Sequence, residues 1–240
     1  MSRLHKFIKR YTSISATIDM LRRKELALLD PQNWDDRNDR YFMSLYKDHV
    51  KASGLYAACF TQSADTYHHW RVFTGESGGL CVEFKREPFE RHIGTNPNLR
   101  FRAVRYLNLG DADKLGSEAR DNLPFYKRMG FEPEQEYRVV AVSEKPQQAA
   151  LGVPIELGFI NKIVINPWLP DALCESLKAT LRSIDQCGRI RIDRSHLIDS
   201  LRWKNAGNKV VGRPEMGRQV LDLDGKRRAK ATQKQGTKRK

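Results

Sequence analysis

Short runs of apolar residues separated by polar segments recur along this chain, and they predict strands. Ala57–Phe60 and Leu80–Phe84 are rich in residues that favour strands, and Phe101–Leu107 alternates as FRAVRYL. Tyr137–Val142 is a largely apolar run with the length of a buried strand. Four further runs predict strands at Leu4–Ile8, Ile155–Ile160, Lys162–Ile165 and Arg189–Ile192.

Helix signals appear in three places. Ser13 and neighbouring hydroxyl residues can cap a helix whose apolar face includes Ile18 and Leu21. Tyr41–Ser53 predicts a second helix. Asp171 can cap a third, in which apolar residues recur at helical spacing.

These elements predict a mixed α+β fold of antiparallel sheet with flanking helices, in one domain over residues 1–224. Residues 225–240 differ in composition, because they carry eight Lys or Arg residues, no acid and no apolar side chain larger than alanine. Such a segment cannot bury enough apolar surface to offset its ordering entropy, so it is predicted to be a disordered tail.

Charge is concentrated in that tail. The chain has a net charge of +14, and removal of the tail's eight cations leaves +6 for the rest. The tail is predicted to bind nucleic acid through phosphate charge, with contacts from Arg227, Arg228 and Lys230, and Arg194 is a further candidate. The alternative is a tail that only increases solubility.

The four cysteines, Cys59, Cys81, Cys174 and Cys187, form no CxxC pair. With no secretion signal and no long apolar run, this pattern predicts a cytoplasmic protein with reduced thiols and no membrane association. Cys59 and Cys81 with His68 and His69 lack the ligand spacing of a zinc site, so no metal is expected.

The loop between the predicted strands Ala57–Phe60 and Leu80–Phe84 holds several aromatic and polar residues, namely Tyr67, His68, His69, Trp70 and Arg71. These side chains either form a half-buried platform that fills the core or bind and stack on a ligand. Tyr67, His69, Trp70 and Arg71 are therefore candidate binding residues.

Acidic residues precede the strand at Tyr137. Glu132, Glu134 and Glu136 are spaced by two, so in an extended chain they would project from one face. Their repulsion would raise the pKa of at least one of them, which suits base catalysis or stabilisation of a cationic transition state. Arg138 can pair with Glu136 on that face. The alternative is an exposed acidic segment.

A second acidic cluster, Asp35, Asp36 and Asp39, lies beside Arg37 and Arg40. It is either a solvated loop held by its own ion pairs or a loop that presents Asp36 or Asp39 to a cation or a sugar hydroxyl.

Several motifs occur in a fixed order. They are LHKF at residues 4–7, DRND at 36–39, CFTQ, HHW and GGLCVEF between residues 59 and 84, VRY at 104–106, PFYKRMGFEPEQEYRVV at 124–140, and NPWL and RSHLI farther on. Together they resemble the bacterial domain-of-unknown-function family 2971 over roughly residues 4–204. That resemblance implies a setting near defence-type genes in bacterial and phage genomes.

The order of His5, the Tyr67–Trp70 segment and Glu134-Gln135-Glu136 also resembles ADP-ribosyltransferase-like folds. This likeness implies a split antiparallel sheet with a cleft for NAD. It further implies that Glu136 stabilises the oxocarbenium-like centre, that His5 holds the ribose, and that Tyr67 or Trp70 stacks on nicotinamide.

Three hypotheses follow. The first is a defence- or toxin-type transferase that modifies a nucleic acid or protein with NAD, using Glu136, Glu134 and His5. The second is a metal-dependent nuclease that uses Asp36, Asp39, Glu83 and Glu136. The third is a non-catalytic nucleic-acid-binding module, with contacts from the tail and from Arg189, Arg191, Arg194, Arg202 and Lys204.

Overall fold

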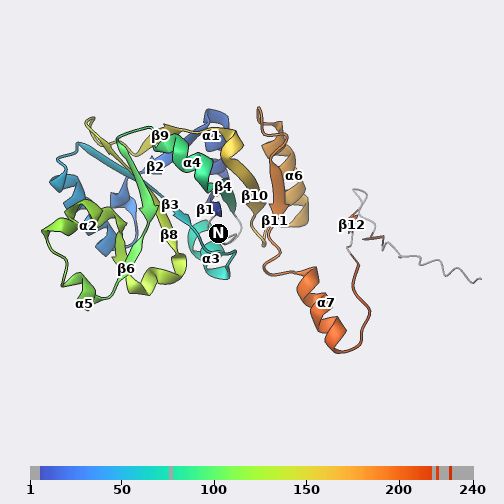
Figure 1. Ribbon diagram of the computed structural model, residues 1–240. Helices are drawn as coiled ribbons and strands as arrows, with labels where there is room; N and C mark the ends of the chain where they lie inside the picture. The colour runs from blue at the N-terminus through green and yellow to red at the C-terminus, as the bar shows by residue number, and fades with distance from the viewer. Residues whose placement is uncertain (1–5, 76–77, 218–219, 222–226, 229–240) are drawn as a thin grey trace, which may run out of the picture. The chain divides into compact units, whose positions relative to one another are not determined.

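The computed structural model describes residues 6–75, 78–217, 220–221 and 227–228. The chain forms two compact units, Met1–Ser195 and His196–Lys240 (Figure 1). The predicted boundary at residue 224 stays a prediction.

A nine-stranded sheet forms the centre of the described part of the first unit. Seven strands follow in the order β11-β10-β4-β1-β3-β2-β9, and β3 also pairs with β8, which pairs with β5. Their bounds are β1 Phe7–Ser13, β2 Glu25–Leu29, β3 Gly54–Thr61, β4 Gly79–Lys85, β5 Leu99–Ala103, β8 Glu136–Ser143, β9 Ala150–Pro154, β10 Ile160–Ile165 and β11 Arg191–Arg194. All described pairings in this sheet are antiparallel except β10 with β11.

The sheet is divided next to β3. β1 pairs with β4 over its whole length but meets β3 at one described position, Lys9 opposite Thr61. β2 likewise meets β3 only where Leu29 lies opposite Ala57, whereas β3 and β8 pair along eight residues. The strands therefore diverge on that side of β3.

Helices and short 3-10 segments flank the sheet. α1 packs on β1, β2 and β4, α3 on β1 and β4, and α2 on β3. The helices are α1 Ile14–Arg23, α2 Arg37–His49, α3 Tyr67–Thr74, α4 Arg86–Ile93, α5 Leu109–Ala112 and α6 Asp171–Ser183, and the 3-10 segments are η2 Pro31–Asn33, η3 Ser117–Phe125, η4 Met129–Glu134 and η5 Leu157–Phe159. The predicted mixed α+β fold with antiparallel sheet and flanking helices is confirmed.

Side-chain alternation along β8 assigns its residues to two faces of the sheet. Tyr137, Val139 and Ala141 belong to the main core, which also includes residues of α1, α4 and α6. Val140 packs with Met43 of α2 instead. Because Glu136 and Arg138 have the same parity as Val140, they lie on the face that α2 covers.

The predicted first helix is present and is capped as expected. Ser13 is its N-cap, and the Ser13 Oγ accepts a hydrogen bond from the Ala16 backbone N–H at 3.1 Å. The helix ends at Arg23, and its C-cap Lys24, with a φ of 54°, turns the chain into β2.

The prediction of a loop at residues 67–71 is wrong, because α3 begins at Tyr67 and includes these residues. Thr66 caps this helix through a hydrogen bond that its Oγ1 accepts from the His69 backbone N–H at 3.2 Å. His69 and Trp70 are buried on its inner side. The segment lies between two strands, which favoured a loop. The Thr66 cap and the buried inner side of the segment instead stabilise a helix.

Three other predictions also need correction. The strand predicted at Phe101–Leu107 is two strands, because β6 Arg105–Leu107 leaves the main sheet to pair in parallel with β7 Tyr126–Arg128. The strand predicted at Ile155–Ile160 is mostly a loop and η5. β9 instead occupies the end of the predicted 145–153 linker and pairs with β2.

The second unit contains α7 Leu201–Val210 and two short paired strands, β12 Val220–Leu221 and β13 Arg227–Arg228. Apart from β13, the predicted tail lies outside the described residues. In the described part of the chain, no helix is both long enough and apolar enough to span a membrane.

Candidate active site

A cleft of about 610 Å³ opens where β1 and β3 diverge. Lys9–Ser13 of β1 and Ala57–Thr61 of β3 line it, together with His69 and Phe73 of α3. Further lining comes from Trp34, Asp36, Asp39, Lys127, Phe131, Glu134 and Glu136. A volume of this size is typical of sites that enclose a small-molecule ligand.

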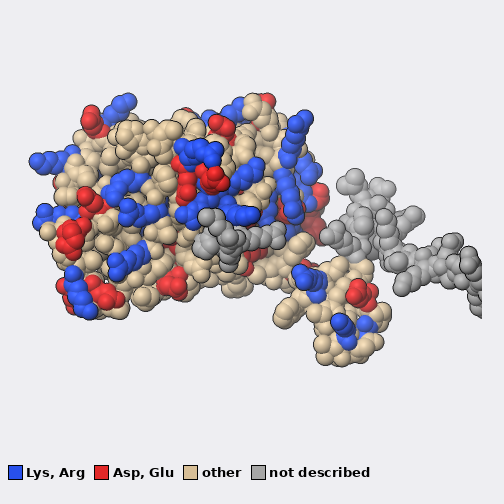
Figure 2. All heavy atoms as spheres, viewed as in Figure 1, with Lys and Arg blue, Asp and Glu red and all other residues tan. Residues whose placement is uncertain are grey.

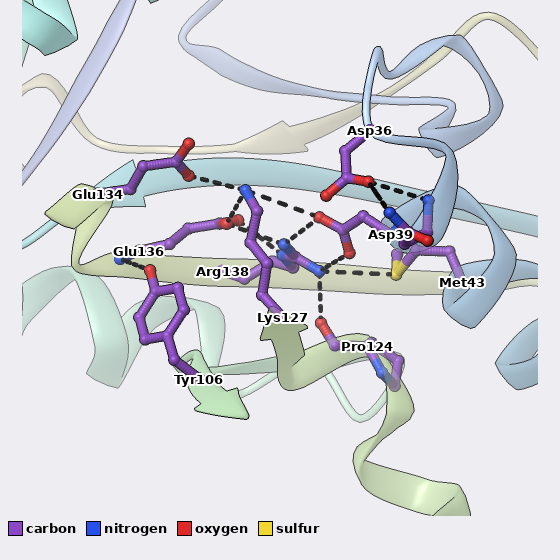
Figure 3. A network of polar contacts seen from close by, with 10 residues as sticks. Asp36, Asp39, Met43, Tyr106, Pro124, Lys127, Glu134, Glu136 and Arg138 are labelled. Atoms are coloured by element: carbon purple, nitrogen blue, oxygen red, sulfur yellow. Dashed lines mark hydrogen bonds and ion pairs between the residues drawn. The ribbon is translucent and has the colours of Figure 1, made fainter. Parts of the chain in front are cut away.

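Arg138 is the fully buried centre of a charged network behind this cleft (Figure 3). Its Nε and Nη2 donate to the two Glu136 carboxylate oxygens at 2.7 and 2.9 Å. Its Nη1 and Nη2 donate to the two Asp39 oxygens at 2.9 and 2.8 Å, and Nη1 also donates to the Pro124 carbonyl at 2.7 Å. The predicted Arg138–Glu136 ion pair is therefore present, and Arg138 pairs equally closely with Asp39.

Lys127 of β7 is a second cation in this network and contacts three carboxylates. Its Nζ lies 2.7 Å from Glu134 Oε2, 3.1 Å from Glu136 Oε2 and 3.8 Å from Asp39 Oδ2. Burial disfavours the charged ammonium, but the charges of Glu136 and Glu134 outweigh burial and raise the Lys127 pKa. Sequence reasoning missed Lys127, because only the pairing of β6 with β7 brings it to the end of β8.

Glu134 and Glu136 have opposite pKa shifts. Burial opposes ionisation of Glu136, but the charge and hydrogen bonds of Arg138, together with Lys127, lower its pKa to about 2. For Glu134, burial is the larger effect and raises the pKa despite the partial compensation from Lys127. Two adjacent carboxyl groups whose environments separate their pKa values are suited to different chemical roles.

Glu132 does not join this pair, so the prediction of three carboxylates on one face is wrong. The segment is not extended there, because η4 runs to Glu134 and Gln135 has a φ of 44°. Glu132 is exposed. The left-handed residue turns the chain so that Glu134 and Glu136 both reach Lys127.

His69 lines the cleft and holds the backbone near Glu134. Its ring is buried, its Nδ1 is 2.5 Å from Thr66 Oγ1, and its Nε2 is 3.2 Å from the Glu134 carbonyl oxygen. Burial lowers the His69 pKa, which favours the neutral ring. Because a carbonyl oxygen only accepts, Nε2 carries the proton and donates it.

The other residues of the predicted aromatic platform do not line the cleft. Trp70 is fully buried and its Nε1 donates to Asp65 at 2.5 Å. Tyr67 is 57% exposed and meets Trp168 edge to face. Arg71 stacks on the same Trp168 ring, with its Cζ 3.9 Å from the centroid.

Two buried polar atoms in the cleft-lining residues have no hydrogen-bond partner among the described residues. One is Asp36 Oδ2, whereas Oδ1 of the same side chain caps α2 by accepting from the Asn38 N–H at 2.9 Å. The other is Nη1 of Arg10, whose Nη2 donates to the Ala27 carbonyl at 3.1 Å. Unpaired buried groups are costly, so both atoms are suited to bind a ligand. Sequence reasoning identified Asp36 but missed Arg10.

The remaining predicted residues are not among the described residues that line the cleft. His5 and Lys230 lie outside the described residues, and the side chains of Arg227 and Arg228 are likewise not described. Arg194 pairs with Asp171 and the Pro167 carbonyl, away from the cleft lining.

The described residues also provide little for the nuclease hypothesis. Glu83 is held by Asn161 and Lys162 and does not line the cleft. Within the described ranges, no three His, Cys, Asp or Glu side chains are arranged to hold a metal ion. Asp39 and Glu136 instead pair with Arg138.

Comparison with known proteins found no matching family model and no matching curated protein. The resemblance to family 2971 therefore stays a prediction. Similar solved structures include DarT from Thermus sp. 2.9 in complex with NAD+, with 12% identity and a TM-score of 0.43 over 79% of this chain and 95% of that one. The same protein in complex with ADP-ribosylated ssDNA has 13% identity and a TM-score of 0.42 over 79% and 94%. At these TM-scores the likeness carries no conclusion about the cleft.

Replacing Arg138 tests the network. Arg138→Met would leave Asp39 and Glu136 buried beside a single cation, so we expect a loss of about 3–5 kcal/mol in the free energy of unfolding at neutral pH. Urea denaturation followed by circular dichroism measures it. Arg91→Met removes an exposed helical ion pair and should change stability by less than about 0.5 kcal/mol. Equal effects of the two substitutions would contradict the network's structural role.

Proposed function

We propose that this chain is a transferase that cleaves the bond between nicotinamide and ribose in NAD and passes ADP-ribose to a nucleophile on a nucleic acid or protein. The observation that carries the proposal is the distribution of charge in the cleft. β1 contributes two cations, Lys9 and Arg10, whereas α2, η4 and β8 contribute carboxylates. NAD has a matching polarity, because its pyridinium ring is positive and its pyrophosphate is negative.

The network formed by Arg138, Lys127 and their three carboxylate partners has excess negative charge when those carboxylates are ionised. Asp39, Glu134 and Glu136 then carry three negative charges, and Arg138 and Lys127 supply two positive charges. A preorganised negative field at a partly desolvated site stabilises a cation more strongly than water does. The developing oxocarbenium ion is such a cation.

Glu136 is the carboxylate assigned to that charge. Its low pKa keeps it ionised across the physiological range, and its hydrogen bonds to Arg138 fix its orientation. The bond between the ribose C1′ and the ring nitrogen breaks with its electron pair going to the nitrogen. The pyridinium ring thereby leaves as neutral nicotinamide, and positive charge develops on the ribose.

Glu134 is the residue assigned to the acceptor's proton. The nucleophile bonds to C1′ and must release a proton to a nearby base, and a carboxylate with a raised pKa is better suited to this than Glu136. In the described part of the structure, only one Glu134 carboxylate oxygen is hydrogen-bonded, to Lys127. The second oxygen is therefore free to take the proton.

The first test measures nicotinamide release from NAD by the full chain, with and without cellular nucleic acid and protein extract. Glu136→Gln should lower the rate at least 100-fold, because it removes the charge that faces the transition state. Its matched control is Asp39→Asn, which removes the other carboxylate on Arg138 and should cost comparable stability with a much smaller loss of rate. Circular dichroism confirms that both variants are folded.

Equal rates for the two variants would assign the loss to the network rather than to catalysis. No release by the wild-type chain under any condition would overturn the transferase proposal.

The second test uses the opposite pKa shifts. Glu134 must be ionised to accept a proton, so activity should fall as pH decreases through its raised pKa. Glu134→Gln should lower the rate and remove that acidic limb from the pH–rate profile. Persistence of the same limb in Glu134→Gln would exclude Glu134 as the base.

A further inference from the structure

Helix α7, in the second unit, is hydrogen-bonded through two asparagine side chains to the segment that follows it. Asn205 and Asn208 bind the segment that follows the helix. Asn205 Oδ1 accepts from the Met216 N–H at 2.8 Å and its Nδ2 donates to the Met216 carbonyl at 3.1 Å, whereas Asn208 Nδ2 donates to the Pro214 carbonyl at 3.2 Å. This local structure is therefore held by amide hydrogen bonds rather than by apolar packing.

Trp203 and Val210 of α7 lie on the face opposite Asn205 and Asn208. Trp203 is 81% exposed and Val210 is 86% exposed. They are seven residues apart, which places them on one face two turns apart. None of the helix's residues is buried, and the Ser200 side chain caps the helix by accepting from the Trp203 N–H at 3.2 Å. The Trp203 indole is therefore held at the surface by a capped helix and does not pack into a hydrophobic core.

The sequence of the second unit is strongly basic. The second unit contains thirteen Lys or Arg residues and four Asp or Glu residues, a net charge of +9 out of the chain's +14. Arg202 and Lys209 of α7 are both exposed. Figure 2 shows basic and acidic side chains interspersed on one face of the first unit. By its sequence, the second unit is the more basic part of the chain.

We infer that α7 binds single-stranded nucleic acid, with Trp203 stacking on an unpaired base and Arg202 and Lys209 contacting phosphates. Cations beside an exposed aromatic ring match a polyanion whose bases present flat surfaces. An anionic membrane fits less well, because α7 itself places two large apolar side chains on this face, Trp203 and Val210, with Val211 exposed just after the helix, and membrane binding scales with buried apolar area. No residue of α7 is among those that line the cleft, so the inference does not depend on NAD chemistry.

Fluorescence anisotropy of labelled single-stranded DNA and RNA, titrated with the full chain at several salt concentrations, tests this inference. Trp203→Ala should weaken binding by about tenfold and leave the salt dependence unchanged, since stacking releases no counterions. The matched control is Tyr41→Ala, which removes an aromatic side chain of α2 that is 61% exposed and should not change affinity. The double variant Arg202→Ala with Lys209→Ala should reduce the slope of log affinity against log salt by about 1.4.

Three results would overturn the inference. They are wild-type affinity in Trp203→Ala, equal affinity for duplex and single strands, and binding of phosphatidylserine vesicles without binding of oligonucleotides. Glu136→Gln should bind oligonucleotides as the wild type does, and Trp203→Ala should release nicotinamide as the wild type does when nucleic acid is absent. Failure of either proposal therefore leaves the other intact.

Discussion

The buried guanidinium of Arg138 connects the parts of the molecule that form the cleft. It joins Glu136 on its own strand to Asp39 on α2 and reaches the carbonyl of Pro124 in η3. Taking these charges out of water is costly, and well-packed apolar residues could hold α2 on the sheet equally well. What apolar packing cannot provide is an ionised carboxylate in a fixed position beside a cleft.

The pairing of Arg138 with Glu136 also determines the ionisation of the carboxyl groups in the cleft. Arg138 keeps Glu136 ionised, and Lys127 brings Glu134 next to it while burial shifts the Glu134 pKa upward. His69 and Thr61 hold the Glu134 backbone by hydrogen bonds to its carbonyl. The divided sheet contributes Lys9 and Arg10 to the cleft from β1. A ligand with one cationic and one anionic group can therefore be matched along a single cleft.

Local sequence pattern predicted much of the fold and one part of the site. The Ser13 cap, the strands at β3, β4 and β8, and the Arg138–Glu136 pair all follow from interactions close in sequence. Lys127, Arg10 and the partnership of Asp39 with Arg138 depend on contacts between distant segments, so no spacing rule indicates them. The sequence did not predict the start of α3 after Thr66 or the left-handed conformation of Gln135. The local sequence signals at both positions are weak, and tertiary packing decides the conformation there.

The most direct measurement is a crystal structure of the full chain with carba-NAD+, an NAD analogue. The account predicts that the ring and its adjoining sugar occupy the cleft, with the carbon that corresponds to C1′ within about 4 Å of a Glu136 carboxylate oxygen and the pyrophosphate near Arg10. Binding of the analogue outside the cleft, or in the cleft with its pyrophosphate against Glu134 and Glu136, would contradict the account.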